Sequence, residues 1–168
     1  MLIQVTIEGL SPLLMNRFPD GDPSGKNRPS IGGEKGTPRE QAEPKLYALP
    51  GGRLYIPGPN IFAAIIAAGS FMKVGKRQLT TMKTSLIPGG VAVVEPECPL
   101  ESKNGKGWVP TQEWEVDSRP VVIPSTGGRI ICHRPRLDTW RVKLTLDVDT
   151  SEFDERTVRD LVDIAGRK

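Results

Sequence analysis

A ten-residue stretch near the C-terminal end alternates between polar and apolar side chains, and this pattern constrains the fold more than any other. In residues 139–148, one face of an extended strand would carry Trp140, Val142, Leu144, Leu146 and Val148. The opposite face would carry Arg141, Lys143, Thr145 and Asp147. A period of two is that of a β-strand with one buried face. We therefore expect a sheet that is covered on one side.

Another alternating strand and two helices supply the rest of the predicted core. Residues 2–8 place Ile3, Val5 and Ile7 on one face of a strand. Residues 61–68 form an apolar run with helical spacing, which is typical of a helix buried on most sides. Residues 151–166 predict a second helix, with Ser151 as its cap and acidic residues in its first turn, where the helix dipole favours them.

The order of the predicted elements indicates an α+β fold. Residues 85–94, 114–123 and 129–134 predict further strands, and we expect residues 129–134 to form a hairpin with residues 139–148. The resulting order fits a ferredoxin-like or RRM-like sandwich with a βαββα core. The complete fold has a further edge strand after the second helix, and we expect that strand to be missing here. We expect one domain over residues 1–168.

Residues 16–45 interrupt this pattern and predict a flexible loop insertion within the domain. The segment has no hydrophobic periodicity, although it contains five of the chain's 16 prolines and five of its 18 glycines. It offers too little apolar surface to offset the entropy of ordering its backbone. Loops of this length in compact domains are often functional, and a plain disordered insertion is the alternative.

Charge is distributed unevenly along the chain, although the formal net charge is only +3. Residues 73–83 contain four basic residues and no acid, and residues 119–143 contain six basic residues and one acid, Asp138. Residues 147–163 reverse this balance with seven acids. Basic surfaces attract phosphates, so the middle of the chain favours a nucleic-acid partner, with an ordinary solvated surface as the alternative.

Several classes of protein are excluded or disfavoured by the same sequence. The longest nearly apolar run, residues 61–72, is too short to span a bilayer, so we expect no membrane partner. The N-terminal segment has no signal-peptide pattern, so we expect a cytoplasmic protein with reduced thiols. Cys98, Cys132 and His133 lack the paired spacing of a zinc site. We expect no metal and no cofactor.

Three segments together resemble the RAMP superfamily of CRISPR effector proteins, especially its Cas7-like backbone subunits. Residues 5–14 are similar to a first strand that runs into a Pro-Leu corner. Residues 54–58 read Leu-Tyr-Ile-Pro-Gly before an apolar helix, and residues 129–148 resemble the strand pair that precedes the second helix. The family often carries an arginine in the first helix, where residues 63–68 here are Ala-Ala-Ile-Ile-Ala-Ala. A virus-encoded or mobile-element relative is equally compatible.

The resemblance implies a non-catalytic subunit of a CRISPR-type ribonucleoprotein that binds single-stranded RNA. Such a subunit would pack beside copies of itself as a homo-oligomer and contact other protein subunits of the complex. Single-stranded DNA is an alternative ligand, because it also displays phosphates and stackable bases. Helix N-termini, basic strands and exposed aromatic rings can each bind such a strand. The candidate RNA-binding residues are therefore Gly58, Asn60, Lys76, Arg77, Trp108, Arg129, His133, Arg134, Arg136, Arg141 and Lys143.

Two other classes of function remain open at this point. A viral or mobile-element protein-interaction module, either a structural subunit or an inhibitor of a nucleoprotein complex, would use an open sheet edge for strand addition. A metal-dependent nuclease would use Asp20 or Asp22, which lie in a turn-like segment. The sequence contains no Walker loop and no Ser-His-Asp set, because His133 is the only histidine, so it does not favour an enzyme.

Overall fold

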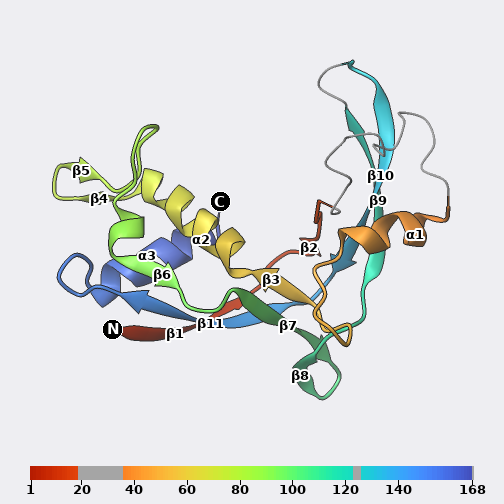
Figure 1. The fold of residues 1–168 in the computed structure, drawn as a ribbon, viewed down its shortest axis with the longest axis horizontal. Coiled ribbons are helices and arrows are strands. Elements are labelled where there is room, and N and C mark those ends of the chain that lie inside the picture. Colours follow the sequence, from red (N-terminus) through yellow and green to blue (C-terminus); the bar gives the residue numbers. More distant parts are fainter. Residues whose placement is uncertain (19–35, 123–125, 168) are drawn as a thin grey trace. The chain divides into compact units, whose positions relative to one another are not determined.

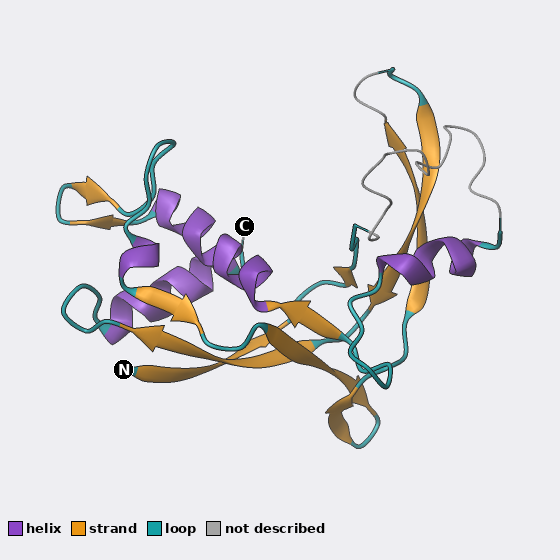
Figure 2. Ribbon diagram, viewed as in Figure 1, coloured by secondary structure: helices purple, strands orange, loops and turns teal. Residues whose placement is uncertain are grey.

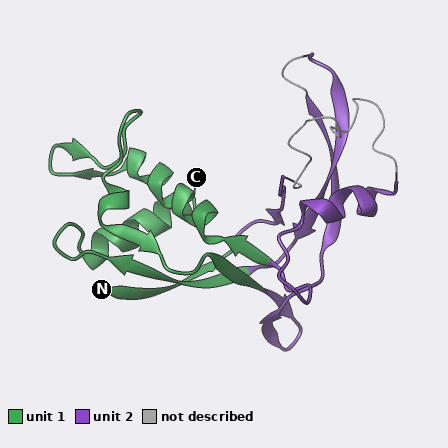
Figure 3. Ribbon diagram, in the orientation of Figure 1, with its two compact units in different colours: residues 1–8, 55–100, 141–168 green, residues 9–54, 101–140 purple. Residues whose placement is uncertain are grey.

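The chain forms a mixed α+β fold with antiparallel sheets, which confirms the predicted class (Figure 1). The structure is a computed structural model that describes residues 1–18, 36–122 and 126–167. The described residues contain three α-helices and several short 3-10 turns (Figure 2). They group into two compact units (Figure 3). Unit 1 comprises residues 1–8, 55–100 and 141–168, and unit 2 comprises residues 9–54 and 101–140.

Unit 1 is built on the two alternating strands that the sequence predicts. Strand β1 (Leu2–Glu8) pairs antiparallel with β11 (Arg141–Val148), and Val5 lies opposite Leu144. The strand order continues from β11 to β7 (Glu97–Asn104) and β3 (Tyr55–Pro57), while β6 (Val91–Val93) pairs with the end of β11. The apolar face of β11 is buried, as the alternation requires.

Both long helices of unit 1 lie on the same side of this sheet and contact each other (Figure 1). Helix α2 (Gly58–Ala68) buries Ile61 and Ile65, and helix α3 (Glu155–Ala165) buries Val158 and Leu161. The cap of α3 differs from the prediction. Asp154, not Ser151, is the N-cap and accepts a hydrogen bond from the Thr157 N–H at 2.6 Å. The Ser151 hydroxyl is instead bound to the Asp149 carboxylate at 2.7 Å, so it does not reach the helix.

The remaining elements of unit 1 lie between α2 and β6. Helix α2 ends in a 3-10 turn, η2 (Gly69–Phe71), and a second such turn, η3 (Ile87–Gly89), precedes β6. Between these turns is a two-stranded hairpin of β4 (Lys73–Val74) and β5 (Arg77–Gln78). The predicted strand over residues 85–94 is thus reduced to β6.

Unit 2 is built on a long β-ribbon. Strand β9 (Glu115–Val122) pairs antiparallel with β10 (Arg129–Leu137), and β2 (Leu13–Leu14) pairs with the end of β10. Pro120 is accommodated because β9 is an edge strand. The end of β7 forms a hairpin with β8 (Gly107–Pro110).

The predicted hairpin between residues 129–134 and 139–148 is wrong. Strand β10 pairs with β9 and β2, whereas β11 pairs with β1 and β6. The short link between β10 and β11 would suit a hairpin. The apolar row of β11 is matched instead by Ile3, Val5 and Ile7 of β1, which lie directly opposite its buried residues. The two basic strands that the sequence placed side by side are therefore not partners.

Part of the segment expected to be a loop is regular. Helix α1 (Pro38–Ala42) is followed by a 3-10 turn, η1 (Glu43–Lys45). Thr37 caps α1, because its hydroxyl accepts the Glu40 N–H at 3.3 Å while the Glu40 carboxylate accepts the Thr37 N–H at 2.7 Å. Ala42 is fully buried, and α1 contacts both strands of the ribbon. Residues 19–35 of this segment lie outside the described residues.

The two thiols differ in burial and are predicted to differ in reactivity. Cys98 is fully buried, and burial together with the nearby Glu95 carboxylate raises the pKa of Cys98 to about 11. Cys132 is half-buried. At pH 8 we expect a thiol reagent to modify Cys132 at least about 100-fold faster than Cys98, because the thiolate is the reactive form. Mass spectrometry of Cys132→Ser and Cys98→Ser variants measures each rate separately, and equal rates in the folded protein would contradict the expectation.

The raised pKa of Cys98 also predicts a pH dependence of stability. The folded protein holds this proton more tightly than the unfolded chain, whose thiol keeps its ordinary pKa of 9.0. The resulting stabilisation is fully present below pH 9 and is lost as the pH rises towards 11.

The helices that the structure describes include none with the length and apolar character needed to cross a membrane.

Candidate nucleic-acid interface

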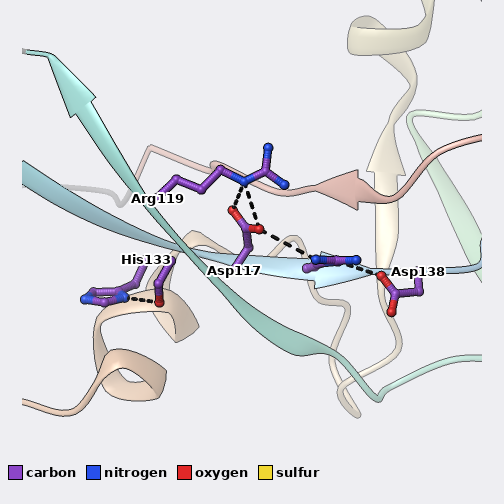
Figure 4. A network of polar contacts seen from close by, with 6 residues as sticks. Asp117, Arg119, His133 and Asp138 are labelled. Atoms are coloured by element: carbon purple, nitrogen blue, oxygen red, sulfur yellow. Dashed lines mark hydrogen bonds and ion pairs between the residues drawn. The ribbon is translucent and has the colours of Figure 1, made fainter.

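The ribbon of β9 and β10 carries three of the candidate RNA-binding arginines: Arg129, Arg134 and Arg136. A buried carboxylate, that of Asp117, already contacts Arg136. Asp117 of β9 is only 7% exposed. Its Oδ2 lies 2.8 Å from Arg119 Nε, and its Oδ1 lies 3.8 Å from Arg136 Nη1 (Figure 4). Arg136 Nε also contacts Asp138 Oδ1 at 2.6 Å. Arg136 is therefore already neutralised by two carboxylates, which weakens it as a phosphate ligand.

Arg134 lies in the same part of the ribbon and is only partly accessible. The register places it directly opposite Asp117. Its Nε atom is buried and has no hydrogen-bond partner among the described residues. The base of the ribbon therefore offers little open cationic surface, because Arg136 is ion-paired and the Arg134 Nε atom is buried.

The distal half of the ribbon, residues 118–122 and 129–133, has a different character. It contains no acidic residue of its own, but Arg119 is bound to Asp117, so the exposed Arg129 is its one arginine without an ion pair among the described residues. His133 is half-buried, and its Nδ1 lies 2.7 Å from the Ser118 hydroxyl, which leaves the other ring nitrogen for a ligand (Figure 4). Three aliphatic side chains are exposed on the distal ribbon: Val122 at 58%, Ile130 at 40% and Ile131 at 65%. This combination of cationic and apolar groups suits a surface that contacts phosphates and bases together.

Arg141 and Lys143 belong to unit 1, as does Arg77, whereas Arg129, Arg134 and Arg136 belong to unit 2. Both lie on the outer face of β11, where Arg141 is opposite Glu8 and Lys143 is opposite Thr6. Asp147 lies on the same face, so the outer face of this sheet carries charges of both signs. Arg141 and Lys143 thus share one face of β11, and β11 does not pair with β10.

Lys76 and Arg77 lie at an exposed hairpin of unit 1 that the sequence had singled out for its charge. Gly75 makes the turn with a φ of 61°, and Val74 pairs with Arg77. We define the basic hairpin as residues 73–78 together with the turn at residues 81–84. All four of its cations are exposed: Lys73, Lys76, Arg77 and Lys83. No acid occurs anywhere between residues 44 and 94. The basic hairpin is therefore a local cationic site with no carboxylate of its own.

Gly58 and Asn60 were nominated because a helix N-terminus can bind a phosphate, but their geometry favours a tight turn. The Gly58 N–H donates to the Pro96 carbonyl at 2.8 Å, and Pro59 has no N–H. A Cβ atom on Gly58 would overlap the backbone carbonyl oxygen of Glu95. The Asn60 N–H is therefore the one backbone donor of the first turn of α2 that remains for a phosphate. The hollow beside it is lined mainly by apolar groups.

The Glu95 side chain fixes this turn against β11. Its two carboxylate oxygens accept hydrogen bonds from the Thr145 N–H and the Thr145 hydroxyl, each at 2.7 Å. Burial alone would raise the pKa of Glu95, but the hydrogen bonds from Thr145 outweigh it and hold the pKa below its ordinary value. The segment that approaches Gly58 is therefore held in place.

The three tryptophans have different surroundings. Trp108 lies half-buried on β8, opposite Lys103. Trp140 donates its indole N–H to the Ser11 carbonyl at 2.9 Å and packs against Gly9, which agrees with a structural role. Trp114 lies in a cleft of about 540 Å³ in unit 2, where the Arg39 guanidinium stacks 4.2 Å from the centre of its ring. Neither residue is among the candidate RNA-binding residues predicted from the sequence, and the loop predicted over residues 16–45 gave no reason to place Arg39 against Trp114.

The nuclease hypothesis depends on residues that the structure does not describe. Asp20 and Asp22, the candidates for a nuclease, lie outside the described residues. Within residues 1–18, 36–122 and 126–167, no group of three or more His, Cys, Asp or Glu side chains could hold a metal ion.

No protein-family model, no curated protein and no solved structure matches this chain.

Proposed function

We propose that this chain is a non-catalytic subunit that binds single-stranded RNA through its phosphate backbone within a CRISPR-type ribonucleoprotein. One observation carries the proposal: each compact unit presents an exposed hairpin that has cations but no carboxylates. These are the basic hairpin of unit 1 and the distal ribbon of unit 2. Exposed apolar side chains accompany the cations on both, with Met82 and Val74 on the first and Ile131 on the second.

The chemistry of a single strand matches these two surfaces. Lysine and arginine follow the phosphates and release condensed counterions, while apolar side chains contact the faces of unpaired bases. Duplex RNA hides its base faces inside the stack, so the apolar groups would gain nothing from it. Of the residues nominated from the sequence, Lys76, Arg77, Arg129 and His133 are assigned to this interface. Arg136 is left out because it contacts Asp117 and Asp138, and Arg134 is left out because its Nε atom is buried.

The arrangement of unit 1 supports a relationship to the RAMP superfamily. Its sheet order of β1, β11 and β7, with α2 and α3 on one side, is compatible with the βαββα ferredoxin-like core that we include in the proposal. We include in the proposal the side-by-side packing with like subunits and the contacts to other protein subunits that this relationship implies.

Binding to a fluorescently labelled 25-nucleotide single-stranded RNA tests the proposal directly. We expect binding at 50 mM salt that weakens as salt rises, with a log–log slope of about −3 if the four cations of the basic hairpin each contact one phosphate. Duplex RNA of the same length is expected to bind more weakly. Fluorescence anisotropy over a salt series measures both. No binding to the single strand at 50 mM salt would refute the proposal.

The exposed aliphatic residues of the distal ribbon favour one alternative, a protein-interaction module of viral or mobile-element origin. A protein surface would cover Val122, Ile130 and Ile131 as effectively as a nucleic acid would. Purified protein without RNA affinity at 50 mM salt, but with a defined oligomeric state that Ile131→Lys disrupts, would favour this alternative over the proposed function.

A further inference from the structure

Strand β1 lies at the edge of the unit 1 sheet and presents one side for pairing. It pairs over its whole length with β11, and no described strand pairs with its other side (Figure 1). Edge strands of soluble proteins are usually protected by proline, lysine, a bulge or a covering loop. The sequence of β1, Leu-Ile-Gln-Val-Thr-Ile-Glu, contains no proline and no lysine, and its register with β11 is continuous, without a bulge.

The hydrogen-bond pattern identifies which backbone groups face the open side. Met1 and Val148 exchange both of their hydrogen bonds, at 2.6 and 2.8 Å, and the Gly9 N–H donates to the Trp140 carbonyl at 2.9 Å. Hydrogen-bonded pairs alternate with non-hydrogen-bonded pairs in an antiparallel ladder. The odd-numbered residues of β1 therefore bond to β11. The N–H and C=O groups that point to the open side belong to Leu2, Gln4, Thr6 and Glu8.

These outward groups are self-complementary. If a second copy of β1 lies antiparallel with a two-fold axis at Val5, Leu2 faces Glu8 of the second copy and Gln4 faces its Thr6. Every outward N–H and C=O then has a partner. Shifting this register by two residues leaves outward groups at each end unpaired, and shifting it by one turns the apolar row to the wrong face.

The side chains fit the same register. Ile3, Val5 and Ile7 are half-exposed along the open edge, on the face that the helices cover. In the register centred on Val5, this residue meets its own copy, and Ile3 meets Ile7 of the second copy. These are non-hydrogen-bonded pairs, in which side chains approach most closely. The only charged residue of the strand, Glu8, faces a leucine, so no like charges oppose each other.

We propose that two copies of this chain associate by antiparallel pairing of their β1 edges about Val5, which joins the two unit 1 sheets. The inference goes beyond the proposed function. A two-fold contact closes at two copies, whereas packing of many subunits along an RNA needs a head-to-tail contact. The association also requires no RNA, so it is tested with the protein alone.

Cysteine cross-linking tests the register. In a Cys132→Ser background, with the buried Cys98 retained, we expect Val5→Cys to form a disulfide-linked dimer under mild oxidation. Ile3→Cys and Ile7→Cys are each expected to remain uncrosslinked alone but to cross-link when mixed. Non-reducing gel electrophoresis gives the yields. Equal cross-linking by all three single variants, or by none, would overturn the proposed register.

A proline variant tests the edge without disturbing the β1–β11 ladder. Because the Thr6 N–H points outward, Thr6→Pro removes a donor only from the open side, and proline is tolerated there. Analytical ultracentrifugation should give a dimer for the wild type and for the control Thr6→Val, which keeps the N–H. Thr6→Pro should raise the dimer dissociation constant about 10- to 100-fold, since each dimer loses two hydrogen bonds, and its melting temperature measured as a monomer should match that of the control. A wild type that stays monomeric at several hundred micromolar, or a Thr6→Pro dimer of undiminished affinity, would overturn the proposal.

Discussion

Reversing the charge of Lys76 and Arg77 to glutamate is expected to weaken binding to single-stranded RNA by about 10- to 100-fold at 50 mM salt. Both side chains are exposed on the basic hairpin, far along the sequence from any acid that could hold them. If each contacts one phosphate, the slope of log affinity against log salt should also become shallower by about 1.4. Fluorescence anisotropy with the same labelled RNA measures the affinity and the slope together.

The matched control reverses two arginines of the same unit. Arg156 and Arg167 are exposed at the two ends of α3, among the acidic residues of the C-terminal segment. Arg156→Glu with Arg167→Glu changes the net charge by the same amount as the test variant. We expect it to reduce affinity by less than about threefold, because these positions are not part of the proposed interface. If both double variants lost affinity equally, binding would depend on net charge alone and the basic hairpin would not be the site.

Replacing Gly58 by alanine is expected to lower the free energy of unfolding by about 3 kcal/mol, the upper range for overpacking a tight contact. The added Cβ would overlap the carbonyl oxygen of Glu95, which is backbone and cannot rotate away. The Glu95 side chain is held to Thr145, and the Gly58 N–H is held to Pro96, so neither segment can move without breaking a hydrogen bond. Thermal unfolding followed by circular dichroism should show a fall of about 6–12 °C in Tm.

Gly89 offers the control for this substitution. It lies in the same unit, and a Cβ atom there would meet nothing within 4 Å. Gly89→Ala should leave the Tm within about 2 °C of the wild type, because an exposed substitution away from tight contacts has little effect. If Gly58→Ala were as stable as Gly89→Ala, the close contact between position 58 and the Glu95 carbonyl oxygen would be contradicted.

The local elements of unit 1 were predictable because their side-chain periods are unambiguous. The alternation in residues 139–148 and 2–8 predicted two half-buried strands, and the apolar stripes predicted α2 and α3. The period of a strand identifies its buried face but not its neighbour. Pairing is decided by side-chain contacts between distant segments, and for this reason β11 was assigned to the wrong partner.

Other features left a signal in the sequence that was missed. Thr37, Pro38 and Glu40 form a capping box with proline at the first helical position, which is a recognised helix start. The surrounding glycines and prolines led to the prediction of a loop instead of helix α1. The position of Arg39 over the Trp114 ring was missed for the same reason. The contact between Asp117 and Arg136 had no such signal. Asp117 lies 19 positions before Arg136 in the chain, and only the register of β9 and β10 brings them together.

The interleaving of the two units has a consequence for how the chain is made. The backbone passes from one unit to the other after residues 8, 54, 100 and 140, so neither unit is continuous in sequence. On the ribosome, β1 is synthesised before its partner β11, and more than 130 residues are added between the two strands. Contacts of such long sequence separation slow folding and leave unpaired strands exposed meanwhile. The edge of β1 that pairs with β11 in the folded protein therefore stays unpaired until β11 has been synthesised.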